Sequence, residues 1–468
     1  MTGRGGAVVR WAVAVACVPS AAAHAAAFQL EARTEAQVAE IPAYRGTDPT
    51  TPVLLPERQL VQYLNLNVYE LITGQDLGFE TSVRVFADLG MPPEEAAMLD
   101  GVRSSGMDLL YASAKYRTGG FEGQLGRQIY VDFMDYMAFD GLRVKYVAPI
   151  GLGAEAYGGL WVKGSSLFSS SFYQPDGTRE TDARRIALLD TSGTTDASLG
   201  AIEPVYGAKL LMEGIHGFSA SLGYRKALLD GATDYERAAA EIRYTRGLGL
   251  SGQAGVEYDL GLARISQFRA QLRYDREIWA LSGEAMRVTP VLSSESIWYY
   301  FANGARNELR LRADYTPVGP LRYYAQAVAS LYDTNVNPAG GLDPTLPALP
   351  SGQNVGGSVV AALRLAHVRA AVDLMYRNGF GGRQLWIDLT GGIFADREAY
   401  TLDGRISVAN IADQLNTLLT GTFYGAQVWG GYKLNPSTRV SMMLEENVNP
   451  FAKSDTRVFF VFDYRVSL

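Results

Sequence analysis

The sequence is poor in the residues on which disulfide scaffolds, metal sites and catalytic triads depend. Its 468 residues include one cysteine and three histidines. A single cysteine cannot form an internal disulfide, and three histidines leave almost nothing from which to assemble a zinc cluster or a His-based triad. No phosphate-binding glycine motif follows a strand and opens a helix. We therefore expect a protein that is not an enzyme and binds neither a metal nor a cofactor.

Long apolar runs and an excess of basic charge are also missing. After residue 27 no stretch of 18 or more apolar residues occurs, which excludes spanning helices. Two of the 42 basic residues and none of the 49 acidic residues lie in 1–27, so the rest of the chain has 40 basic residues and a net charge of −9. This acidic balance does not indicate a basic surface of the kind that binds nucleic acid.

Residues 1–27 have the features of an export signal peptide. Arg4 and Arg10 flank or precede the short apolar run Trp11–Val18, and small residues follow it. Cys17 is interpreted as an ordinary residue of that run, so the exported chain has no cysteine. The protein is expected to leave the cytoplasm.

The next segment, residues 28–58, is predicted to be a periplasmic N-terminal leader. We find no strand-like alternation in it, and it carries several prolines, which disfavour central strands. They are Pro42, Pro49, Pro52 and Pro56. The remaining residues, 59–468, are predicted to form one domain.

That domain repeats one pattern: 8 to 13 residues of strict alternation, divided by Gly, Pro, Asn or Asp. In Asn307–Tyr315 one face carries Leu309, Leu311, Ala313 and Tyr315, and the other carries Glu308, Arg310, Arg312 and Asp314. The same division appears in residues 141–146, 241–244, 251–260, 268–274, 321–332 and 368–377. Such alternation predicts an all-β protein.

Tyrosine placement indicates which solvent surrounds the apolar face. Tyrosines on that face lie toward strand ends, as expected for an aromatic girdle at a membrane interface. They are Tyr116, Tyr146, Tyr224, Tyr244, Tyr274, Tyr315, Tyr376 and Tyr464. The opposite face is too charged for a hydrophobic core. Because lipid does not tolerate an unpaired sheet edge, the sheet must close. We predict a transmembrane, antiparallel up-and-down β-barrel.

Counting alternating segments gives about 21 strands, but a single-chain barrel normally has an even number. The count depends on Gln59–Phe86 and Ala395–Leu418, and Ile406–Leu419 could instead be a loop helix. We predict 18 strands, within a range of 16–20.

Connections alternate between short and long. Short ones are residues 117–120, 316–319 and 434–437, and long ones are Gly164–Gly200 and Asp333–Asn354. Short turns on one rim and long loops on the other are typical of outer-membrane barrels.

The end of the chain resembles the carboxy-terminal insertion signal of bacterial outer-membrane barrel proteins, although that signal usually ends in Phe. The residues concerned are Phe460, Phe462, Tyr464, Val466 and Leu468. The resemblance implies a Gram-negative outer-membrane location and the barrel-insertion machinery as a partner.

By parity, a row of cations and aromatic residues faces the barrel interior. It comprises Arg143, Lys145, Tyr157, Trp161, Arg243, Arg269, Arg273, Arg310, Arg312, Arg322, Arg369 and Arg377. Guanidinium groups bind carboxylates in bidentate fashion, so the row could guide an anionic solute. Acidic residues on the same wall, among them Glu308 and Asp314, allow the alternative that the row is an ion-paired structural wall.

Residues 121–163 resemble the alginate-export type of outer-membrane porin. The resemblance lies in Leu125–Gln128 (LGRQ) and Phe139–Arg143 (FDGLR). It implies an 18-stranded monomeric barrel with a positively lined conduit for an acidic polysaccharide, assisted by periplasmic polysaccharide-export proteins. Arg127 and Arg143 are the motif positions that it assigns to the solute path.

Three functions remain open. The favoured one is export of an acidic exopolysaccharide. The alternative is a passive diffusion porin for small solutes, in which Gly164–Gly200 or Ile406–Leu419 folds inward and sets the size limit. The third is a structural or adhesive barrel with a plugged lumen. In each case the expected surroundings are outer-membrane lipid and lipopolysaccharide.

Overall fold

The computed structural model describes residues 27–45, 48–72, 74–90, 105–134, 136–162, 203–229, 231–247, 249–289, 305–332, 352–379, 382–395, 398–412, 420–449 and 454–467. Among these residues, no helix is long and apolar enough to cross a lipid bilayer. The regular elements of the described residues are β-strands.

In chain order the strands are β1 Ala27–Arg45, β2 Asp48–Tyr69, β3 Asp76–Asp88, β4 Ser105–Thr118, β5 Phe121–Val131, β6 Tyr136–Val147, β7 Leu152–Val162, β8 Pro204–Ile215, β9 Phe218–Leu229, β10 Ala232–Arg246, β11 Leu250–Asp259, β12 Arg264–Asp275, β13 Trp279–Val288, β14 Arg306–Tyr315, β15 Leu321–Tyr332, β16 Gly352–Arg364, β17 Val368–Gly379, β18 Gly382–Ala395, β19 Tyr400–Ala412, β20 Gly421–Asn435, β21 Thr438–Val448 and β22 Asp455–Ser467.

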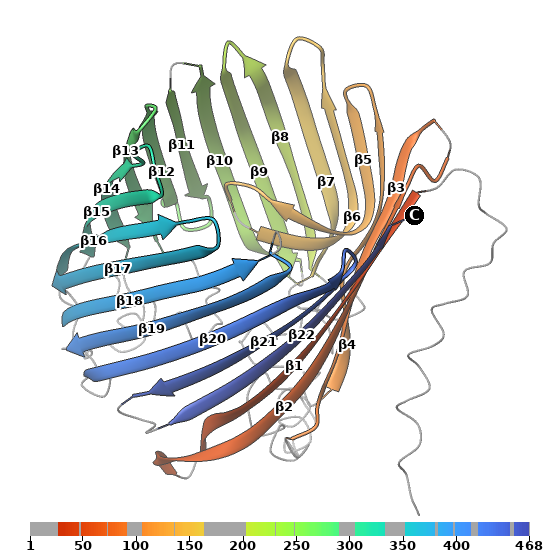
Figure 1. The fold of residues 1–468 in the computed structure, drawn as a ribbon. Helices are drawn as coiled ribbons and strands as arrows, with labels where there is room; N and C mark the ends of the chain where they lie inside the picture. The colour runs from red at the N-terminus through yellow and green to blue at the C-terminus, as the bar shows by residue number, and fades with distance from the viewer. Residues whose placement is uncertain are drawn as a thin grey trace, which may run out of the picture.

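These strands form one antiparallel sheet that closes into a barrel (Figure 1). Each strand pairs with the next in sequence, and β1 pairs with β22 from Gln29 opposite Ser467 to Val38 opposite Val458. Closure gives the first and last strands partners, so no sheet edge is left between them. The predicted all-β, antiparallel up-and-down barrel is confirmed.

The predicted strand number was wrong. The described residues form 22 strands, outside the expected range of 16–20. Part of the error lies at Ile406–Leu419, which was considered as a loop helix: residues up to Ala412 belong to β19, while 413–419 lie outside the described residues. The alternation had indicated about 21 strands, so the pattern itself was the better guide.

The segment predicted as a periplasmic leader, residues 28–58, is part of the barrel wall. It forms most of β1 and the first part of β2. Phe28, Leu30 and Ala32 alternate with polar residues, so the strand signal was present before the first proline. The prolines fall near the β1–β2 connection. Residues 1–26 lie outside the described residues, and the export signal stays a prediction.

The barrel has distinct inner and outer sides. In a single-walled barrel only the inside offers other protein to cover a side chain, so the buried Phe139, Tyr157 and Arg225 mark the inner side of their strands. Cross-strand partners point the same way, which extends this assignment around the sheet. The outer side carries large exposed apolar residues, such as Leu309 and Leu311 on β14.

The two rims differ as predicted. Both ends of the barrel chain, Ala27 and Ser467, lie at the rim where ten connections of two to six residues join the strands, β2–β3 being the first and β20–β21 the last. The opposite rim has the four longest connections, which follow β3, β7, β13 and β15. Gly164–Gly200 and most of Asp333–Asn354 belong there by sequence but lie outside the described residues.

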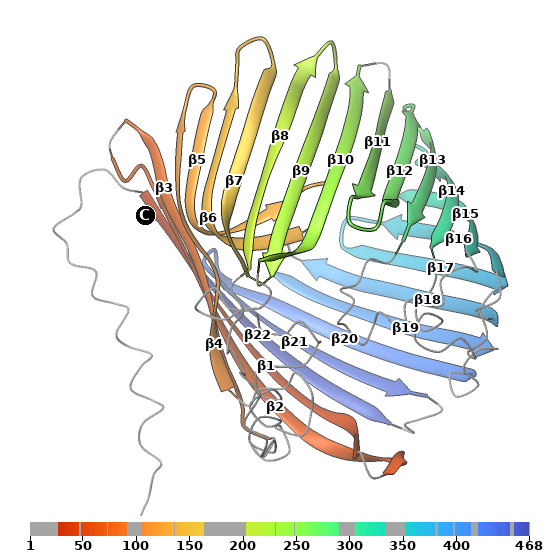
Figure 2. The ribbon, with the colours of Figure 1, turned by 180° about the vertical axis from the view of Figure 1, so that it is seen from behind.

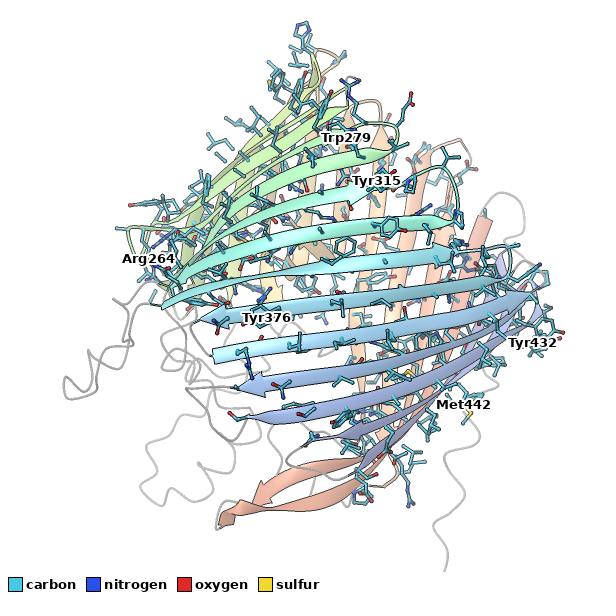
Figure 3. The ribbon with its side chains drawn as sticks, turned by 60° about the vertical axis from the view of Figure 1, so that its left-hand side comes forward. Arg264, Trp279, Tyr315, Tyr376, Tyr432 and Met442 are labelled. Atoms are coloured by element: carbon cyan, nitrogen blue, oxygen red, sulfur yellow. The ribbon has the colours of Figure 1, made fainter. Side chains whose placement is uncertain are left out.

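Aromatic side chains lie on the outer side near the short-turn rim. Tyr315 faces Tyr323 with ring centroids 6.2 Å apart, and Tyr400 faces Tyr432 at 4.7 Å. Figure 3 shows labelled members of this face, including Trp279, Tyr315 and Tyr432. The predicted aromatic positions fit this rim for six of eight tyrosines; Tyr224 and Tyr376 lie further along their strands. The ones at this rim are Tyr116, Tyr146, Tyr244, Tyr274, Tyr315 and Tyr464.

The C-terminal strand β22 has the predicted outer face. Phe460, Phe462, Tyr464 and Val466 lie opposite outward-facing residues of β1, such as Ala36 opposite Phe460. Leu468 lies outside the described residues. Recognition of this strand by the insertion machinery stays a prediction.

Candidate functional site

The tip of the β5–β6 hairpin turns into the barrel, where Figures 1 and 2 both show it lying across the interior. β4 and β5 pair from Thr118 opposite Phe121 to Ala112 opposite Arg127. Beyond Arg127, β5 leaves the wall. Gly126 lies at this point with φ of +120°, and a Cβ there would come within 2.3 Å of the Ala112 carbonyl oxygen. Only glycine meets both conditions without strain.

One carboxylate fastens the hairpin tip to the inner wall. Asp132 Oδ2 lies 3.0 Å from Lys209 Nζ on β8, and its Oδ1 lies 3.0 Å from Arg225 Nη2 on β9. The Asp132 Oδ1 also accepts a hydrogen bond of 2.9 Å from the Met134 backbone N–H. The side chain of Arg225 is 0% exposed, so this ion pair is removed from water.

Apolar packing accompanies the ion pair. Met137 and Phe139 of the hairpin are fully buried with Tyr157, Val205 and Ala227 of the wall. Further along, Phe133 lies over Gly255 of β11, where a Cβ would meet the ring at 2.3 Å. The wall is therefore hollowed to receive the hairpin.

Aromatic rings and arginines alternate inside this contact. Tyr130 donates a hydrogen bond to Glu155, and its ring lies 4.7 Å from that of Tyr157. The guanidinium carbons of Arg143 and Arg225 lie 5.5 and 5.6 Å from the Tyr130 ring centroid. The hairpin is thus joined to the wall by hydrophobic, cation–π and ionic contacts together.

Arg127 does not fit the solute path in which the sequence placed it. Its side chain is 2% exposed, donates to both Asp140 oxygens at 2.7 and 2.8 Å, and donates from Nη1 to the Leu109 carbonyl oxygen at 3.0 Å. These bonds join β4 to β6 at the point where β5 departs. Arg127 holds the base of the hairpin and offers no free donor surface to a solute.

Beyond the hairpin, the inner side of β12–β22 carries arginines that project past their acidic partners. Arg310 bonds Glu308 and lies 3.5 Å from Glu284; its side chain is 34% exposed, against 2% and 11% for the acids. Arg312 bonds Asp314 at 2.6 Å and also stacks on Tyr324, 4.2 Å from the ring centroid. The carboxylates lie against the wall, and the guanidinium groups face the lumen.

The same arrangement continues around this side. Arg269 pairs with Glu284 at 2.5 Å, and Arg273 lies 3.4 Å from the more buried Asp314, although its nearer partner Asp275 is itself 45% exposed. Arg369 pairs with Asp403 at 2.7 Å, and its side chain is 47% exposed. We call this set the arginine ladder: Arg269, Arg273, Arg310, Arg312, Arg369, Arg405 and Arg457.

The other predicted site residues also lie at inward-facing positions, in two groups. Arg143, Lys145, Tyr157 and Trp161 lie on β6 and β7, next to the hairpin contact, where Arg143 pairs with Glu155 at 2.9 Å and Lys145 with Glu213 at 2.7 Å. The second group lies outside that contact. It consists of Arg243, which pairs with Glu241 at 2.8 Å, and of Arg322 and Arg377, for which no ion pair with a described residue occurs.

Sequence reasoning missed Asp132, Lys209 and Arg225, which decide where the hairpin lies. Asp132 follows the last residue of β5, and its Asx-type bond to Met134 is a turn signal that the sequence does contain. Nothing in the local sequence indicates its partners, because 77 and 93 residues separate Asp132 from Lys209 and Arg225.

Within the described residues, no group of three or more His, Cys, Asp or Glu side chains is arranged to hold a metal ion. His216 and His367 lie in separate turns, β8–β9 and β16–β17.

No protein-family profile and no curated protein matches this chain. Similar solved structures include the outer membrane protein OpdK of Pseudomonas aeruginosa, at 10% identity, with 95% of this chain and 99% of that chain covered and a TM-score of 0.43. A BenF-like porin of Pseudomonas fluorescens Pf-5 is 9% identical, with 95% of this chain and 99% of that chain covered and a TM-score of 0.46. OccAB4 of Acinetobacter baumannii is 7% identical, with the same coverage of the two chains and a TM-score of 0.44. These similarities carry no inference about a solute. The likeness to alginate-export barrels finds no support in them.

Proposed function

We propose that this protein is an outer-membrane channel for small anionic solutes. The observation that carries the proposal is the arginine ladder, in which guanidinium groups project into the lumen while their carboxylates lie against the wall. An anion that passes along β12–β22 contacts the exposed guanidinium groups before it can approach the more buried carboxylates. Such a field concentrates anions near the wall.

The β5–β6 hairpin, rather than Gly164–Gly200 or Ile406–Leu419, is the inward-folded element that we propose sets the size limit. It takes up space on one side of the lumen, and its tip is fixed by Asp132. The free width is then bounded by the hairpin on one side and the arginine ladder on the other.

This arrangement favours the small-solute porin over export of an acidic exopolysaccharide. A polyanion needs a continuous row of unpaired cations, whereas every arginine of the ladder already has an acidic partner. Paired arginines bind a passing monoanion weakly and release it readily, which suits diffusion.

The location and partners belong to the same proposal. The apolar outer side with tyrosines at the short-turn rim suits a bilayer. Export through the signal at residues 1–27, insertion by the barrel-insertion machinery through β22, and a surround of outer-membrane lipid and lipopolysaccharide would bring the chain there.

The test is ion selectivity in a planar bilayer under a KCl gradient. Arg310→Glu with Arg312→Glu replaces two lumen cations by anions, and we expect the chloride-to-potassium permeability ratio to fall by about two- to fivefold. The matched control is Arg310→Lys with Arg312→Lys, which keeps the charge and should keep the ratio. An unchanged ratio in the Glu variant, or a wild-type barrel without conductance, would contradict the proposal.

A further inference from the structure

Part of the inner wall is apolar. Trp429 on β20, Met443 on β21 and Phe459 on β22 are successive cross-strand neighbours on the inner side. In the next row Val461 and Val61 lie on either side of Glu35. These residues line a recess of about 490 Å³, whose other lining residues include Arg33, Gln37 and Gln427.

A second recess, of about 400 Å³, adjoins the first near the short-turn rim. Three arginines from adjacent strands line it: Arg322 on β15, Arg364 on β16 and Arg369 on β17. Arg364 and Arg369 lie directly opposite each other, although like charges in that position repel. Asp403 is the one acid among the lining residues, and Glu398, outside the lining, lies 3.6 Å from Arg364.

Trp429 lines both recesses. Its direct neighbour on β19 is Asp403, which accepts two bonds of 2.7 Å from Arg369 across β18. The bridge crosses at Gly392, where a Cβ would come within 1.9 Å of Asp403 Oδ1. Gly392 thus brings the Arg369 guanidinium to within one strand of the apolar residues.

We propose that the two recesses form one site for an organic anion that carries a hydrocarbon portion. This inference rests on the proposed channel function and narrows its solute. The carboxylate would bind Arg369, whose guanidinium reaches β19, with Arg322 and Arg364 adding positive charge nearby, and the hydrocarbon would lie along Trp429 and Met443. Two strand spacings separate β19 from β21, or about 10 Å at ~4.8 Å each, so the site suits a small amphipathic acid.

The preference for a hydrocarbon portion follows from the hydrophobic effect, because the apolar row is in contact with the water of the lumen. Trp429 and Met443 are partly exposed to the lumen, and a hydrocarbon chain laid on them removes apolar surface from water on both partners. A sugar acid satisfies the arginines equally well but leaves the apolar row wet. The chemistry therefore distinguishes two anions of equal charge.

The experiment compares hexanoate with gluconate, both six-carbon monoanions, as blockers of chloride current through the channel in planar bilayers. We expect hexanoate to reach half-maximal block at about tenfold lower concentration than gluconate. Equal block by the two anions would overturn the inference while leaving the anion channel intact.

Variants locate the effect. Met443→Gln should weaken block by hexanoate about fivefold and leave block by gluconate unchanged. The matched control is Met286→Gln. Met286 is an inward-facing methionine on β13 opposite Arg269, and its substitution should change neither the block by hexanoate nor the block by gluconate. If Met286→Gln weakens hexanoate block as much as Met443→Gln does, the site lies elsewhere.

Failure of the channel function itself can be separated from failure of the site. If the wild-type barrel conducts no chloride, the proposed function falls. Calorimetric titration of the detergent-purified barrel with the same two anions then still decides the inference, because binding does not need conduction. If the barrel binds hexanoate no more tightly than gluconate in that titration, the proposed site is rejected.

Discussion

The inner wall has two sides that use the same residue types in opposite ways. On β4–β11, under the hairpin, Arg225 is buried with the acid Asp132. On β12–β22, arginine side chains remain about a third to a half exposed, and their acids are the more buried partners, as with Arg369 and Asp403. One side resembles a protein core with charges in it, and the other resembles a solvated surface.

The difference shows that lumen-facing parity does not determine the role of a residue. Every one of these arginines lies in a strand with polar residues on one face, so local sequence treats them alike. What separates them is whether another segment covers them. A covered ion pair is expensive to break, whereas an uncovered one is nearly neutral to stability and free to act on a solute.

The largest expected effect is at the covered side. Asp132→Ala leaves the buried Arg225 without its carboxylate, and breaking such a pair costs about 3–5 kcal/mol. We expect the hairpin to leave the wall, with a larger single-channel conductance and new protease cleavage near residues 131–136. An unchanged conductance together with normal stability would show that Asp132 does not hold the hairpin.

A smaller effect should follow from filling the hollow that receives the hairpin. Gly255→Val places a side chain where the Phe133 ring lies, and overpacking of this kind costs about 1–3 kcal/mol. Chemical unfolding in detergent measures the loss. Adding Phe133→Ala to the same variant removes the clash and should restore most of the stability; a double variant no better than the single one argues against this packing.

The smallest expected change in stability is on the uncovered side. Asp314→Asn removes the carboxylate shared by Arg312 at 2.6 Å and Arg273 at 3.4 Å, but both arginines face water. Stability should fall by less than about 1 kcal/mol, while the chloride preference in a bilayer should rise. The control is Asp314→Glu. A destabilisation as large as that of Asp132→Ala would erase the distinction between the two sides.

Particular residues show how far sequence reasoning reaches. The alternation in Asn307–Tyr315 gave the correct inner and outer sides of β14, since the period of a strand is a local property. The same reasoning overlooked Phe28–Val38, because the prolines that follow it were allowed to define the whole segment. The resemblance of residues 121–163 to alginate-export porins placed Arg127 in the solute path, and its motif gave no sign that Asp140 and the Leu109 carbonyl would enclose it.

The sequence by itself determined that the chain is a closed β-barrel, which side of strands such as β14 faces outward, and which rim has the short turns. These follow from alternation, closure and turn length, which depend on neighbours in the chain. Only the tertiary structure decided that the β5–β6 hairpin folds inward, which arginines it covers, and that Trp429 lies between a cationic and an apolar recess. Those properties depend on contacts between residues tens of positions apart. Periodicity is a local property of the sequence, whereas the burial of a side chain depends on which segment of the chain packs against it inside the barrel.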